Sequence, residues 1–135
     1  DLEIILNGGI QTLEDAGDHL KKLDGVMIGR EAYRNPYILS RADGSIFSDD
    51  HPIPNRLDIA EAIIPYVETQ LKDGVPLNRM TRHFLGLFHG QPGARLWRRH
   101  ISENAHTRGA NSDVLQQAMA LVRGNRLECG CSTID

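Results

Sequence analysis

The sequence has few cysteines and no long apolar run. Its two cysteines, Cys129 and Cys131, flank one glycine near the end, so they form no disulfide framework and have no CxxC partner with which to complete a zinc site. The histidines also lack metal-ligand spacing, and we predict no metal site. No apolar segment approaches the ~20 residues needed to cross a membrane, and no signal peptide precedes the first predicted strand. These absences favour a reducing, cytoplasmic location without a membrane partner.

Acidic and basic residues are unevenly distributed along the 135 residues. Residues 1–54 hold five Lys/Arg and ten Asp/Glu, whereas residues 55–135 hold ten Lys/Arg and eight Asp/Glu. Within residues 79–108 there are six arginines, four histidines and one acid, Glu103. Such a concentration of positive charge predicts an anionic partner for the second half of the chain.

The first 30 residues predict a βαβ unit. Residues 2–6 form an apolar run typical of a buried parallel strand, and Val26-Met27-Ile28 form a second. Between them Thr12 is placed to cap a helix that continues through Leu13, Ala16, Leu20 and Leu23. Strand, helix and strand in so short a length require a parallel pair. A chain that starts at Asp1 directly in a strand is expected of a piece of a longer protein.

The rest of the sequence predicts a change from α/β to all-helical structure. A short helix is expected from Arg30 to just before Asn35-Pro36, and Pro65 is expected to kink or restart the next long helix. Further helices are expected at 77–88, 94–105 and 113–122. We divide the chain into residues 1–42 (two βα units), 43–56 (a linker), 57–126 (a helical domain) and 127–135 (a disordered tail).

Two turns between strand and helix are candidates for a phosphate site. Asn7-Gly8-Gly9 follows the first strand, and Gly29-Arg30 follows the second. Glycines let backbone N–H groups approach a phosphate, and an arginine at a helix N-terminus adds a bidentate donor. Two such turns about 20 residues apart match the phosphate site after the last two strands of a TIM barrel. The alternatives are a hairpin at Asn7-Gly8, which the following helix disfavours, and plain turn glycines beside a surface arginine.

The basic residues of the second half are predicted to share helix faces. On a helical wheel the polar residues Arg79, Arg82 and His83 oppose Leu77, Met80, Phe84, Leu87 and Phe88. Arg95, Arg98 and Arg99 likewise oppose Trp97 and Ile101, which we assign to the core. The arginine faces are candidates for binding an RNA backbone, and the alternative is a solvated polar face.

Several long motifs resemble the tRNA-dihydrouridine synthases, and the later ones resemble the A-type branch of that family. They are Asn7-Gly8-Gly9-Ile10, Asp24 through Pro36, Arg82 through Phe88, Pro92-Gly93-Ala94-Arg95, Trp97-Arg98-Arg99 and Ser102 through His106. The resemblance implies an α/β fold, the last two βα units of a TIM barrel, followed by an all-helical C-terminal domain that binds tRNA. It also implies that Asn7, Gly8, Gly9, Gly29 and Arg30 hold the phosphate of FMN. The RNA-binding residues are expected to be Arg79, Arg82, His83, Arg95, Arg98 and Arg99.

The same resemblance implies an activity for a longer parent protein. Members of the family use NADPH to reduce uridine to dihydrouridine in the tRNA D-loop, at positions 20 and 20a in the A-type branch. Their catalytic cysteine belongs to barrel strands before Asp1, so we assign no catalytic residue here and expect this chain alone to be inactive. We expect the whole protein to be a monomer. The rival interpretations are another FMN-binding barrel oxidoreductase of small molecules and a non-catalytic RNA-binding module.

Overall fold

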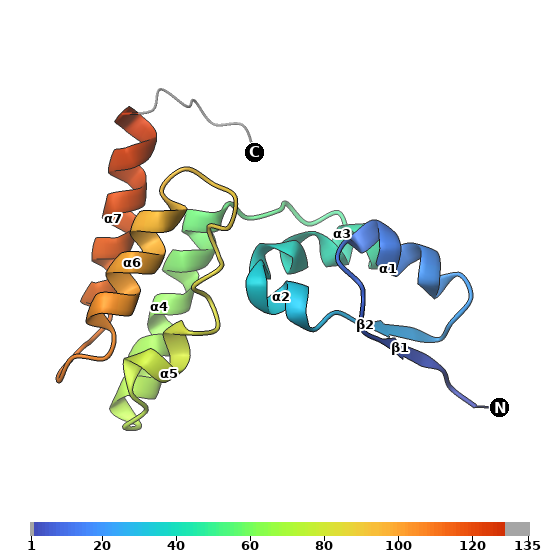
Figure 1. The fold of residues 1–135 in the computed structure, drawn as a ribbon, viewed down its shortest axis with the longest axis horizontal. Coiled ribbons are helices and arrows are strands. Elements are labelled where there is room, and N and C mark those ends of the chain that lie inside the picture. The colour runs from blue at the N-terminus through green and yellow to red at the C-terminus, as the bar shows by residue number, and fades with distance from the viewer. Residues whose placement is uncertain (1, 129–135) are drawn as a thin grey trace. The chain divides into compact units, whose positions relative to one another are not determined.

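The computed structural model describes residues 2–128, and of residues 126–128 only the backbone. The chain is helix-rich, with one small parallel sheet, and divides into two compact units, Asp1–Ile53 and Pro54–Asp135 (Figure 1). Among the described residues no helix is both long and apolar enough to cross a membrane.

Unit 1 contains the predicted parallel strand pair. Strand β1 (Ile5–Asn7) pairs with β2 (Gly25–Met27), with Leu6 opposite Val26. Strand β1 is shorter than the predicted 2–6 and ends one residue later, whereas β2 has the length of the predicted 26–28 but lies one residue earlier. Asp24 sets the start of the pairing, because its carboxylate accepts a hydrogen bond from the Ile4 amide at 2.8 Å and its own amide donates to the Ile4 carbonyl.

The expectation that these strands are fully buried is wrong for this chain. Leu2 is 91% exposed, Ile4 56% and Ile5 59%, whereas Leu6, Val26 and Ile28 are half-buried. A parallel strand is buried on both faces only when layers cover both sides. The two described strands lack cover on both faces, so Leu2, Ile4 and Ile5 are exposed to solvent.

The connecting helix α1 (Leu13–Leu20) begins where the sequence predicts. The Thr12 hydroxyl accepts a hydrogen bond from the Asp15 amide at 3.1 Å, which confirms the cap. Leu13 and Ala16 of this helix are buried together with Ile10. Helix α1 packs against β2, which covers one side of the strand pair.

Three short helical segments complete unit 1. They are α2 (Arg30–Arg34), the 3₁₀ helix η1 (Pro36–Arg41) and α3 (Ala42–Phe47), which ends at Ser48 in the left-handed conformation with φ 55°. Helix α2 is confirmed, but residues 43–47 are helical where the sequence predicts a loop. The Asp43-Gly44 pair, which indicates a turn, instead occupies the first turn of α3, where an acidic side chain is favourable.

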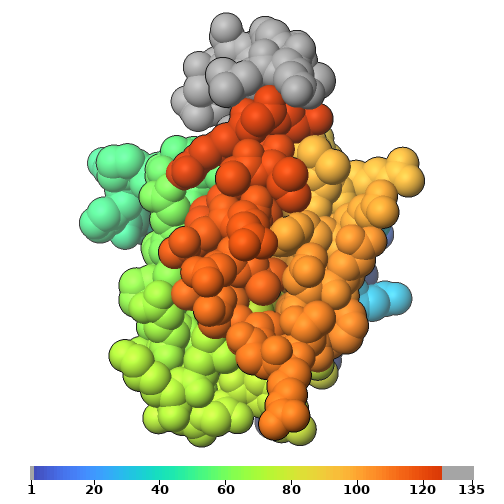
Figure 2. Space-filling view, turned by 90° about the vertical axis from the view of Figure 1, so that its left-hand side faces the viewer, coloured from blue at the N-terminus to red at the C-terminus, as the bar shows by residue number. Residues whose placement is uncertain are grey.

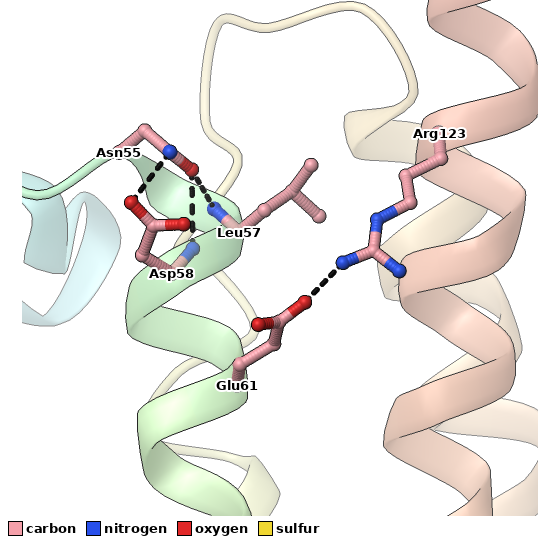
Figure 3. Close-up of polar contacts among 5 residues, drawn as sticks. All are labelled: Asn55, Leu57, Asp58, Glu61 and Arg123. Carbon is pink, nitrogen blue, oxygen red and sulfur yellow. Dashed lines mark hydrogen bonds and ion pairs between the residues drawn. The ribbon is translucent and has the colours of Figure 1, made fainter.

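Unit 2 is built from helices, the longest of which is α4 (Arg56–Lys72). The Asn55 side chain caps it by accepting hydrogen bonds from the amides of Leu57 and Asp58 at 2.9 and 3.1 Å (Figure 3). Pro65 lies inside α4 without ending it, so the predicted restart does not occur. The other helices are α5 (Leu77–Thr81), α6 (Ala94–Asn104) and α7 (Asp113–Glu128).

Helix α7 lies between α4 and α6 on the face shown in Figure 2. It is longer than the predicted 113–122, and its last residues include 127 and 128, which the sequence assigns to the tail. The rest of that tail, with both cysteines, lies outside the described residues. Two polar contacts join α7 and its preceding residue to α4: Arg123 pairs with Glu61 (Figure 3), and Ser112 donates to Glu68 at 3.0 Å.

Trp97 of α6 is central to the core of unit 2. It is 1% exposed, and its ring lies 4.8 Å from that of Phe88, centroid to centroid, at 55°. The other fully buried large side chains in this unit are Leu77, Leu87, Ile101, Leu115, Val67 and Val122. The predicted apolar faces are therefore confirmed, with Phe84 half-buried.

The predicted helix 77–88 is wrong beyond Thr81. From His83 to Gln91, five amides donate to the carbonyl three residues earlier, which produces successive tight turns instead of an α-helix. Two carbonyls in this segment have partners distant in sequence. The Phe84 carbonyl accepts from the Trp97 indole at 3.4 Å, and the Leu87 carbonyl accepts from Arg56. Tertiary contacts thus replace part of the helical ladder.

Gly93 permits the close packing of α6 against α7. Its φ is +83°, and a Cβ added there would lie 3.2 Å from the Cα of Val122. Gly109 has nearly the same backbone angle, φ +81°, but an added Cβ would meet no atom within 4 Å. Both glycines therefore need a left-handed backbone, but only at Gly93 would an added side chain lie close to a neighbouring residue.

We predict that Gly93→Ala destabilises unit 2 by about 2–4 kcal/mol, the sum of a left-handed alanine and a backbone clash. Gly109→Ala is the matched control and should cost about 1 kcal/mol, from the backbone angle alone. Urea unfolding of each variant, followed by far-ultraviolet circular dichroism, measures the difference. Equal losses for the two variants would contradict the packing argument.

Candidate functional site

One hollow in unit 1 brings both predicted phosphate turns together. It has a volume of ≈ 400 Å³, and its lining includes all five residues predicted to bind phosphate: Asn7, Gly8, Gly9, Gly29 and Arg30. The cause is the parallel register. Asn7 pairs with Met27, so β1 and β2 end at the same edge, and the residues that follow them meet there.

The glycines after β1 adopt backbone angles that favour glycine. Gly8 has φ +114° and Gly9 has φ +79°, and a Cβ added at either would meet no atom within 4 Å. The turn is therefore open towards the hollow, and its glycines are required by backbone conformation. Exposed glycine amides in such a turn can donate hydrogen bonds to an anion.

Arg30 is the first residue of α2 and lines the hollow from the other turn. Gly29 precedes it in an irregular conformation, φ −99° and ψ −82°, with no side-chain cap. Because α2 has only five residues, its dipole is small, and the guanidinium of Arg30 supplies most of the positive charge that this turn offers.

The hollow also has lining residues that the sequence did not single out: Ile10, Gln11, Met27, Glu31 and Arg34. Arg34 and Glu31 add a second cation and a carboxylate. The signal that could have identified Arg34 was its spacing, since residues four apart on a helix lie on the same face. Glu31 and Met27 carried no comparable signal, because their placement depends on how the two turns meet.

The six residues predicted to bind RNA are all exposed in unit 2. On α6, Arg95, Arg98 and Arg99 face solvent while Trp97 and Ile101 are buried, as predicted. Arg79 lies on α5, whereas Arg82 and His83 lie in the turns that follow it. The two groups belong to segments that pack together through Trp97 and Phe88.

Ion pairing leaves most of these arginines uncompensated. Arg99 donates to Glu103 at 2.8 Å, and this hydrogen bond raises the pKa of Arg99. In the part of the chain that the structure describes, no ion pair involves Arg79, Arg82, Arg95 or Arg98. The surface therefore keeps an excess of positive charge suited to phosphate groups.

No cluster of three or more potential metal ligands occurs among residues 2–125, whose side chains the structure describes. Catalytic acids were not predicted in this chain, and the hollow is lined by arginines, amides and glycines with a single carboxylate, Glu31. These donors are suited to holding an anion.

Comparison with known proteins gives a consistent answer over nearly the whole chain. Residues 1–123 match the dihydrouridine synthase (Dus) family. A tRNA-dihydrouridine(20/20a) synthase of Vibrio vulnificus is 55% identical over 121 residues, which are 90% of this chain and 37% of that protein. Proteins of the same name from Yersinia pestis and Escherichia coli K12 are 52% and 49% identical over 90% and 93% of the chain.

The chain spans little more than a third of the length of these relatives. The match nevertheless includes both turns predicted to bind phosphate, α6 and most of α7. A family match over 123 of 135 residues is decisive: the chain belongs to the dihydrouridine synthase family.

Proposed function

We propose that this chain is the C-terminal part of a flavin-dependent tRNA-dihydrouridine(20/20a) synthase, which uses NADPH to reduce uridine in the tRNA D-loop. The observation that carries the proposal is that one hollow in unit 1 is lined by both turns that the family resemblance assigns to FMN phosphate. The named relatives support the reaction, and they do not favour a small-molecule oxidoreductase or a non-catalytic module.

The residues of the hollow fit the phosphate of FMN. Gly8 and Gly9 leave their amides accessible, and Arg30 provides two parallel N–H donors for phosphate oxygens. FMN, when bound, supplies the hydride for reduction of the uracil ring. The role of this chain is to hold the phosphate, which positions the ring system that the rest of the protein surrounds.

In this proposal β1 and β2 are the last two strands of a TIM barrel. Their exposed apolar side chains, such as Ile4 and Ile5, are those that further barrel strands and side-chain layers would cover. Unit 2 is the tRNA-binding domain, which presents its arginines to the phosphate backbone. A cytoplasmic location and a monomeric whole protein stay predictions.

The phosphate assignment is tested by Arg30→Ala in the full-length protein. Loss of a charge-assisted contact of about 1.5–3 kcal/mol should weaken FMN binding by about ten- to a hundredfold. Arg41→Ala is the matched control, since Arg41 is also exposed in unit 1 but does not line the hollow. Fluorescence titration of flavin-free protein measures both affinities. Unchanged FMN affinity in Arg30→Ala would remove Arg30 from the site.

The chain by itself should be colourless and should form no dihydrouridine. Two strands cannot enclose an isoalloxazine ring, and the predicted catalytic cysteine lies outside this sequence. Absorbance of the purified chain and assay of the tRNA product check this expectation. Stoichiometric FMN, or product above background, would show that the active site has been misplaced.

The RNA surface is tested by the salt dependence of tRNA binding to the full-length protein. If unit 2 contacts about four phosphates of a duplex region, log K should fall against log salt with a slope of about −3 to −4. Arg95→Glu with Arg98→Glu should flatten the slope by about one unit per lost contact, without loss of helicity. Lys72→Glu, a single charge reversal at the end of α4, is the control and should leave the slope unchanged. If the arginine reversals leave the slope unchanged, the arginine faces are only solvated and do not bind RNA.

A further inference from the structure

The hollow of unit 1 is lined by a second cation besides Arg30. Arg34 lies four residues after Arg30 on α2 and lines the same hollow. Neither arginine forms an ion pair with another of the described residues. Glu31 contributes the one carboxylate of the lining, so the formal charge around the hollow is two positive and one negative.

A terminal phosphate needs this second cation more than an uncharged ligand does. A phosphate monoester carries about 1.5 to 2 negative charges at pH 7 and has three strong acceptor oxygens. With Arg30 alone, Glu31 would cancel the formal charge that faces it. With Arg34 added, one net positive charge remains, and further donors are available for the remaining oxygens.

We propose that Arg34 is a second phosphate ligand of this hollow and that it makes the site selective for a flavin with a terminal phosphate dianion. The inference rests on the proposed function, because it takes the hollow as the FMN phosphate site. Residues four apart on a helix present their side chains to the same side, so both guanidinium groups can reach one phosphate. Arg34 thus adds to the preference for FMN over riboflavin that Arg30 already provides.

The test compares FMN with riboflavin in the full-length protein. Arg34→Gln keeps a long polar side chain and removes the charge. It should weaken FMN binding about three- to tenfold, because solvent screens an exposed cation, and should leave riboflavin binding unchanged. Arg41→Gln is the matched control and should change neither affinity, since Arg41 does not line the hollow. Fluorescence titration of flavin-free protein gives each affinity.

A pH series adds a readout that a structural role would not produce. The second ionisation of a phosphate monoester has a pKa of about 6. Above that pH the ligand is a dianion, so the ratio of wild-type to Arg34→Gln affinity for FMN should rise between about pH 5 and pH 7.5. The corresponding ratio for riboflavin should stay constant.

The outcomes separate the two proposals. If Arg30→Ala weakens FMN binding and Arg34→Gln does not, Arg34 is no ligand and the FMN site stands. If Arg34→Gln weakens FMN and riboflavin equally, its role is structural and the inference is overturned. If neither Arg30→Ala nor Arg34→Gln changes the affinity for FMN, the hollow is not the FMN phosphate site, and the inference about Arg34 fails with it.

Discussion

The parallel pairing of β1 with β2 is the constraint on which the candidate site depends. Parallel strands end at the same edge, so the turns after Asn7 and Met27 must meet, although they are 20 residues apart. An antiparallel pair would put the two turns at opposite ends and divide the hollow. The capped helix α1 makes the parallel arrangement possible, because a parallel connection requires a crossover.

A different contact organises unit 2. The Trp97 indole donates to the Phe84 carbonyl, and its ring packs on Phe88, so α6 and the turns after α5 are joined by one side chain. Burial of Trp97 turns Arg95 and Arg98 to the solvent on the other side of α6. The apolar and the basic faces of this helix are thus two results of the same packing.

The structure differs from the expected secondary structure where side chains distant in sequence donate hydrogen bonds to backbone carbonyl groups. The segment after Thr81 has helical periodicity in its sequence. Arg56 and Trp97 nevertheless donate hydrogen bonds to its carbonyl groups, and the segment forms tight turns. In α4, Pro65 lies inside the helix, which continues beyond it. Local propensity is a weak guide where tertiary contacts compete with it, as they do in the segment after Thr81.

The sequence by itself determined the elements that depend on neighbours in the chain. Thr12 caps α1, the glycines after β1 take positive φ, and the period of α6 separates Trp97 from the arginines. These features follow from backbone sterics and from helical spacing, which act over a few residues. The motifs that indicate the family are also contiguous in the sequence, so they can be found without the structure.

Which side chains line the same hollow or pack against each other depends on the tertiary structure. It placed Arg34 and Glu31 in the hollow with Arg30, brought Val122 against Gly93, and joined Glu61 to Arg123. It also left the strands exposed, since burial of a strand depends on layers that no strand sequence contains. Such contacts join residues distant along the chain, and spacing within a single element does not encode them.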